Sequence, residues 1–134
     1  MQSSYLIKDL TIIPNVKGDI YKALSCDDLT FNGIEEAYFT CIKYKETKGW
    51  KKHLKMQLNL IVVSGVVEFH IKDDSKELVK NIEMSANKLA RLTIFPGVWV
   101  SFTGSSNEKN MILNLANLKH DPLEVSNKPL DFFE

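Results

Sequence analysis

The sequence is poor in cysteine and in long apolar runs, and each absence excludes a class of protein. Cys26 and Cys41 are the only cysteines among 134 residues, too few for a disulfide framework and without CxxC spacing, so we expect two small buried side chains. No apolar stretch reaches the length of about 18 residues that a membrane helix needs, and the N-terminus has no signal-peptide pattern. We therefore expect a cytoplasmic protein without a membrane partner.

The sequence also has no excess of charge of either sign. Lysine plus arginine and aspartate plus glutamate both number 17, so the formal net charge is zero. Without a basic face, a nucleic-acid partner is not expected. With 44% apolar and 25% charged residues, and with no repeat, low-complexity run or linker, the chain is predicted to form a single domain over residues 1–134.

Apolar residues repeat with the period of two that is typical of β-strands. Short segments rich in Ile, Val, Phe, Tyr and Thr are separated by turn residues such as Lys48-Gly49, Ser64-Gly65 and Pro96-Gly97. We predict strands near residues 5–13, 37–44, 54–63, 66–72, 89–95, 98–103 and 111–118. Only residues 76–84 and the tail after Pro122 are expected to hold a turn or two of helix. This pattern predicts an all-β sandwich or barrel.

Residues 48–65, KGWKKHLKMQLNLIVVSG, read as one β-strand with two different faces. One parity is apolar, whereas the other carries Lys51, His53, Lys55, Gln57 and Asn59. A solvated amphipathic strand would show the same row, but the row turns apolar at Ile61 and Val63, which favours a polar mouth above a closed barrel. We predict that the five polar side chains line one cavity, with Arg91 and Trp99 near its rim.

Three stretches resemble a known family. The unit LNLIVVSGVVEFHIKDDS followed by LARLTIFPGVWVSF has the hairpin order of a double-stranded β-helix, or jelly roll. With KGWKKH as its entry strand and NLANLKHDPLEV as its exit, the sequence resembles the cupin superfamily over about residues 14–125. Within it, the resemblance is to the sugar-nucleotide branch of dTDP-4-dehydrorhamnose 3,5-epimerases and dTDP-4-keto-6-deoxyhexose 3,4-ketoisomerases. It implies an all-β cupin jelly roll.

The resemblance implies a cofactor-free epimerase of a nucleoside-diphosphate 4-keto-6-deoxy sugar in deoxysugar or surface polysaccharide biosynthesis, with 3,4-ketoisomerisation as the alternative. Such chemistry needs a base beside the carbonyl and a donor or cation for the enolate oxygen. His53 matches the second histidine of the ketoisomerase pair and is the expected base. Lys51 replaces the first, which is also the epimerase base, and is expected to stabilise the enolate or act as a base. The expected substrate-binding residues are Lys55, Gln57, Asn59, Arg91, Trp99 and Asn114, the last near the position of the epimerase tyrosine.

Two other functions stay open. A metal cupin needs a pair of histidines, a carboxylate and a later histidine, but Lys51 replaces the first histidine and neither His70 nor His120 falls on that pattern. We therefore expect no metal and no cofactor, and we place His120 in an exit turn with Asp121. A catalytically silent cupin that binds a nucleotide sugar is favoured by the substituted histidine and tyrosine, whereas the mixed polar row favours a site of some kind.

The sequence also predicts a homodimer. A short open barrel exposes apolar edges and one apolar sheet face. Tyr38, Leu54 and Met56 are expected to face outward, and a second subunit would cover part of that surface.

Overall fold

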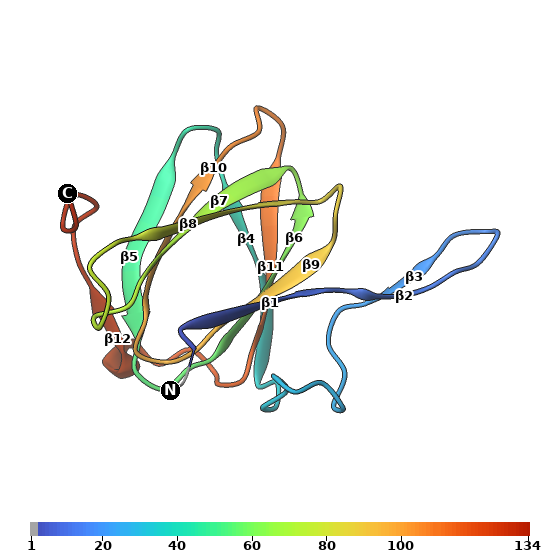
Figure 1. Ribbon diagram of the computed structural model, residues 1–134, viewed down its shortest axis with the longest axis horizontal. Coiled ribbons are helices and arrows are strands. Elements are labelled where there is room, and N and C mark those ends of the chain that lie inside the picture. The colour runs from blue at the N-terminus through green and yellow to red at the C-terminus, as the bar shows by residue number, and fades with distance from the viewer. Residues whose placement is uncertain (1–2) are drawn as a thin grey trace.

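The computed structural model describes residues 3–134, which form an antiparallel β-sandwich (Figure 1). The first sheet consists, in spatial order, of β1 (Tyr5–Asp9), β9 (Ala90–Ile94), β6 (Leu58–Ser64), β11 (Asn110–Ala116) and β4 (Glu36–Ile42). The second consists of β12 (Val125–Asn127), β5 (Thr47–His53), β10 (Trp99–Gly104), β7 (Val66–Lys72) and β8 (Lys80–Ser85). This is the jelly-roll order, and the all-β prediction is confirmed.

Alternating apolar side chains fill the space between the sheets. In β7, Val67, Phe69 and Ile71 are at most 2% exposed, and burial of each such side chain stabilises the fold by about 1.5–3 kcal/mol. His70 lies between them in sequence but on the outer face, where its Nδ1 atom bonds the side chain of Asn81 at 2.8 Å. His70 therefore points away from the core.

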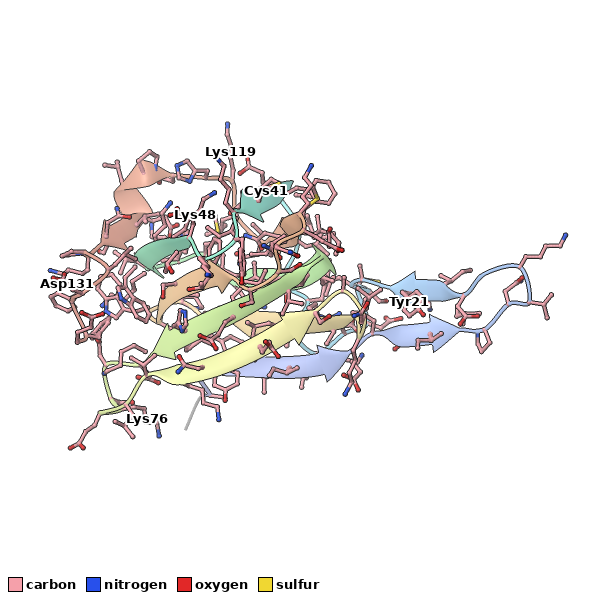
Figure 2. The ribbon with its side chains drawn as sticks, turned by 90° about the horizontal axis from the view of Figure 1, so that it is seen from above. Tyr21, Cys41, Lys48, Lys76, Lys119 and Asp131 are labelled. Carbon is pink, nitrogen blue, oxygen red and sulfur yellow. The ribbon has the colours of Figure 1, made fainter. Side chains whose placement is uncertain are left out.

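A hairpin of β2 (Thr11–Ile13) and β3 (Ile20–Lys22) projects away from the sandwich (Figures 1 and 2). We call residues 11–22 the arm. Every residue of its two strands is exposed, although Ile12, Ile20 and Tyr21 are among them. An isolated two-stranded hairpin is marginally stable in water, so the arm needs a covering surface.

The prediction of a single strand over residues 48–65 is wrong. β5 ends at His53 and β6 begins at Leu58, and the residues between them carry the chain from the second sheet to the first. The buried carboxylate of Glu124 accepts hydrogen bonds from the backbone amides of Lys55 and Met56 at this crossing. The alternation of faces is thereby interrupted, and Met56, expected to face outward, is 1% exposed.

Two further expectations are corrected. Residues 76–84 are expected to hold a turn or two of helix, but Lys80–Ser85 form β8 at the edge of the second sheet, because Ile82 and Met84 alternate inward to pack on the core. Cys26 and Cys41 are exposed, not buried. The tail after Pro122 does contain the expected turn, as a 3₁₀ helix at Pro122–Glu124. None of the helices formed by residues 3–134 is long and apolar enough to cross a membrane.

Asp73 ties the beginning of β1 to the loop between β7 and β8. Its carboxylate accepts a hydrogen bond from the Ser4 hydroxyl at 2.5 Å, and bonds from the backbone amide and hydroxyl of Ser75 at 2.9 and 2.8 Å. These bonds, with that from Ser4 the strongest, favour the charged form and lower the pKa of Asp73 to about 2.

The stabilising effect of Asp73 is expected to depend on pH. Because the pKa of the carboxyl is lower in the folded than in the unfolded state, its contribution is present above about pH 4 and is lost as the pH falls towards 2. We expect Asp73→Asn to lower the melting temperature by a few degrees at neutral pH, and the gap from wild type to close on acidification, as followed by circular dichroism. Asp74→Asn, at an exposed carboxylate, is the control. A gap that is independent of pH would contradict this assignment.

Candidate active site

A cavity of about 470 Å³ opens between the two sheets. Its apolar wall is formed by Leu58, Leu60 and Ile112 from the first sheet and by Phe69 from the second. Its polar lining comes from both sheets and from the loop after β11, and consists of Tyr38, Thr40, Thr47, Lys48, Lys51, His53, Asn114 and His120. The combination of an apolar wall with a few polar side chains is typical of a small-molecule site.

Gly49 lets β5, which carries Lys51 and His53, lie close against β10. Its φ angle of 127° is one that side-chain-bearing residues rarely adopt. A Cβ atom added at this position would lie 2.6 Å from the Cβ atom of Ser101. Gly49 of the KGWKKH stretch is therefore required by the structure. A side chain at this position would push β5, which supplies part of the cavity lining, away from β10.

His53 and Glu124 form a close polar pair beside the cavity. The Nδ1 atom of His53 lies 2.6 Å from Oε1 of Glu124, and the two side chains are 12% and 4% exposed. Glu124 ends the 3₁₀ helix and leads directly into β12, where Val125 is in register with His53. Since Nδ1 is held by the carboxylate, Nε2 is the ring nitrogen available to a ligand.

The environment of Glu124 keeps its carboxylate charged. Burial raises its pKa, but hydrogen bonds from His53 and from the amides of Lys55 and Met56, at 3.0 and 3.2 Å, outweigh this effect, so the pKa lies below its ordinary value. A charged acceptor on Nδ1 orients the imidazole and stabilises the imidazolium that forms when Nε2 takes a proton. The pair therefore has the geometry of a general base and its orienting carboxylate.

Tyr38 and Asn114 lie on the first sheet, opposite β5. They are in register between β4 and β11, and Nδ2 of Asn114 donates to the Tyr38 hydroxyl at 2.9 Å. Because the hydroxyl oxygen accepts this bond, its own O–H can still donate to a ligand. The expectation that Tyr38 faces outward is wrong. In this strand Tyr38, Thr40 and Ile42 point inward, and the phenol of Tyr38 lies beside Asn114.

The structure brings three of the predicted site residues to this cavity, namely Lys51, His53 and Asn114. Lys55 lies in the crossing between the sheets, where its backbone amide bonds Glu124 and its side chain is exposed. Trp99 lies on the outer face of β10 and packs against Phe132 and Phe133, with ring centroids 6.4 and 6.1 Å apart. The predicted rim position of Trp99 is therefore wrong, because odd and even residues of β10 face opposite ways.

Gln57, Asn59 and Arg91 lie on the outer face of the first sheet, beneath residues 23–31. The Nε2 atom of Gln57 and the Nη1 atom of Arg91 each donate to a backbone carbonyl of this covering segment at 2.6 Å. Asn59 is fully buried and accepts a hydrogen bond from Thr93. The prediction that these side chains face the cavity is wrong, and they are not solvated either, because the covering segment buries them.

The sequence interpretation missed Glu124 as the partner of His53, and Tyr38 and His120 as residues that line the cavity. The first two are brought to the site by strand pairing between residues distant in sequence, which no local pattern marks. His120 was recognised only as part of a turn. Within residues 3–134, no group of three His, Cys, Asp or Glu side chains is placed to hold a metal ion.

A model of the family described as FdtA: WxcM-like, C-terminal matches residues 3–134. A search of curated protein sequences finds no match. Among solved structures, a dTDP sugar isomerase from Desulfovibrio desulfuricans is similar with a TM-score of 0.85 and 22% identity, over 96% of this chain and 85% of that one.

Two further structures share the fold. A variant of the QdtA 3,4-ketoisomerase from Thermoanaerobacterium thermosaccharolyticum, in complex with TDP-4-keto-6-deoxyglucose, has a TM-score of 0.81 and 23% identity over 99% of this chain and 93% of that one. The 3'-monoepimerase ChmJ from Streptomyces bikiniensis, in complex with dTDP-quinovose, has a TM-score of 0.83 and 11% identity over 96% and 71% of the two chains. These similarities confirm the cupin jelly roll predicted from the sequence.

Removal of the Glu124 carboxylate is expected to destabilise the fold. Glu124→Ala leaves the buried amide of Met56, and the amide of Lys55 beside it, without their acceptor, at a cost of about 1–3 kcal/mol for each fully buried group. Urea denaturation measures this loss, and Glu77→Ala, at an exposed position, is the matched control. Equal stability of the two variants would show that the crossing between the sheets does not depend on Glu124.

Proposed function

Because the chain belongs to the family described as FdtA: WxcM-like, C-terminal, we propose that it isomerises a nucleoside-diphosphate 4-keto-6-deoxy sugar without a cofactor. The first candidate reaction is a 3,4-keto shift, and the second is epimerisation beside the carbonyl. The observation that carries the proposal is the hydrogen bond of 2.6 Å between His53 and the buried Glu124 at a cavity between the sheets. A cytoplasmic location stays a prediction.

His53 is the proposed base. The 4-keto group acidifies the hydrogen on carbon 3, and Nε2 of His53 removes it while Glu124 stabilises the resulting imidazolium. The hydroxyl of Tyr38 and the ammonium of Lys51 stabilise the negative charge that develops on the sugar oxygen. The same imidazolium then returns the proton to carbon 4, and the carbonyl is left at carbon 3.

Two considerations favour the keto shift. A single base on one face of the intermediate can carry the hydrogen from carbon 3 to carbon 4, and the cavity offers an imidazole held by a carboxylate. Both solved isomerases are also more similar to this chain in sequence and in length than the epimerase is. These features support the keto shift over the epimerisation that the resemblance to the sugar-nucleotide cupins implies.

Epimerisation is supported by a different observation. It requires an acid on the opposite face of the enolate from the base. Tyr38 lies on the first sheet and His53 on the second, and both line the cavity between them.

A silent binding module remains the non-enzymatic alternative. Lys48 and Lys51 suit the diphosphate of a nucleotide sugar whether the protein is an isomerase, an epimerase or a binding module.

We also propose that the protein is a homodimer in which the arm of each subunit covers the outer face of the partner's first sheet. The arm is apolar and projects away from its own sandwich (Figure 2). On the outer face of the first sheet, Phe39 is 62% and Val63 37% exposed. One chain thus carries both an apolar arm and an apolar sheet face. In a two-fold dimer, the arm of each subunit would cover the sheet face of the other. The zero net charge adds no repulsion between copies.

The reaction is tested with dTDP-4-keto-6-deoxyglucose in deuterated water, with the sugar ring protons followed by NMR. A keto shift moves the carbonyl signal from carbon 4 to carbon 3, whereas epimerisation exchanges a proton without moving the carbonyl. His53→Asn is expected to lower either rate by about a hundredfold or more, because it removes the base. If no reaction occurs but the nucleotide sugar raises the melting temperature, the binding-module alternative holds.

The dimer is tested by light scattering at micromolar concentration. Wild type is expected at twice the mass of the chain, and the double variant Ile12→Asp/Tyr21→Asp at the mass of one chain, because two charges would enter an apolar contact. Leu78→Asp, at a position that is 82% exposed outside both surfaces, is the control and should stay dimeric. A monomeric wild type would refute the proposal.

A further inference from the structure

The proposed keto shift moves two protons, and His53 accounts for one of them. As the carbonyl passes from carbon 4 to carbon 3, carbon 3 loses a hydrogen and carbon 4 gains one. At the same time oxygen 3 loses its hydroxyl proton and oxygen 4 gains one. The second transfer needs a group that both accepts and donates a proton near neutral pH.

His120 is a cavity residue of this type. The other polar side chains that line the cavity, apart from His53, are lysines, threonines, a tyrosine and an asparagine. The second transfer needs a side chain that accepts a proton and donates it again. Histidine is the side chain that does both near neutrality. His70, by contrast, lies on the outer face of the second sheet with its ring nitrogens bonded to Asn81 and Thr103.

The local structure places His120 in a braced turn. Asp121 accepts the amide hydrogen of Leu123 at 3.0 Å, and Pro122 begins the 3₁₀ helix that ends at Glu124. Residues 120–124 therefore present an imidazole to the cavity at one end and the carboxylate that holds His53 at the other. His120 itself is exposed, so a ligand that enters the cavity can reach it.

We propose that His120 is the second acid–base residue of this cavity. It takes the proton from oxygen 3 and returns it to oxygen 4, so the imidazole ends in the state in which it began and no co-reactant is consumed. His53 works on the carbon atoms throughout. This inference rests on the proposed keto shift and adds a catalytic residue to it.

The two roles are separable in the NMR experiment in deuterated water. His120→Asn is expected to retain deuterium exchange at carbon 3 within a few-fold, while migration of the carbonyl falls by about a hundredfold. His53→Asn is expected to lose both. His70→Asn is the matched control and should change neither, and the melting temperature of each variant is measured to confirm folding.

A compensating substitution provides a second test. Lys51 lies two positions before His53 on the same strand and lines the same cavity, so a histidine there would present an imidazole to the ligand. We expect the double variant Lys51→His/His120→Asn to restore carbonyl migration at least tenfold over His120→Asn alone. A double variant no faster than the single one would count against the inference.

The outcomes distinguish this inference from the function on which it rests. If wild type moves the carbonyl and His120→Asn does so at the same rate, the inference is wrong and the keto shift stands. If His120→Asn loses exchange and migration equally, His120 does not act on the oxygens. If wild type neither exchanges nor moves the carbonyl, the keto shift is refuted, and the inference with it.

Discussion

The carboxylate of Glu124 is the group on which both the fold and the candidate site depend. A buried carboxylate is unfavourable unless it is fully partnered, and here it accepts hydrogen bonds from His53 and from the amides of Lys55 and Met56. The two amides belong to the crossing that carries the chain from one sheet to the other, and the imidazole belongs to the cavity. One charge thus stabilises the turn between the sheets and orients the proposed base.

Other segments of the chain cover parts of the outer faces of the two sheets, whereas the cavity opens between the sheets. Residues 23–31 cover part of the outer face of the first sheet, where Arg91 pairs with Asp28 at 3.2 Å. The C-terminal residues cover the second, where Phe133 packs edge-on against Trp50 at 4.9 Å. Gln57 and Arg91 on the first of these faces, and Trp50 and Trp99 on the second, contact the covering segments. The polar side chains that line the cavity point inward between the sheets.

The sequence predicted the fold more completely than the site, because the two depend on interactions of different range. Alternation along a strand and the glycine turn between β6 and β7 are local, so the jelly roll could be inferred from them. The polar row of residues 51–59 was misread because its continuity is broken by Glu124, more than sixty positions away. Tyr38 was misplaced for a similar reason, since its direction follows from its register with Asn114. His53 and Lys51 were found because they share one face of one strand.

Lys51 brings a positively charged side-chain type to the lining of the cavity. Lys48 lines the cavity as well, with its ammonium bonded to the backbone carbonyl of Cys41 at 2.7 Å, and the carboxylate of Glu124 beside the site is engaged with His53. An uncharged sugar would leave these cations uncompensated, whereas a diphosphate would balance them. The same positive charge would stabilise the enolate of the proposed reaction. The lysines would therefore contribute both to binding of the nucleotide and to activation of the sugar.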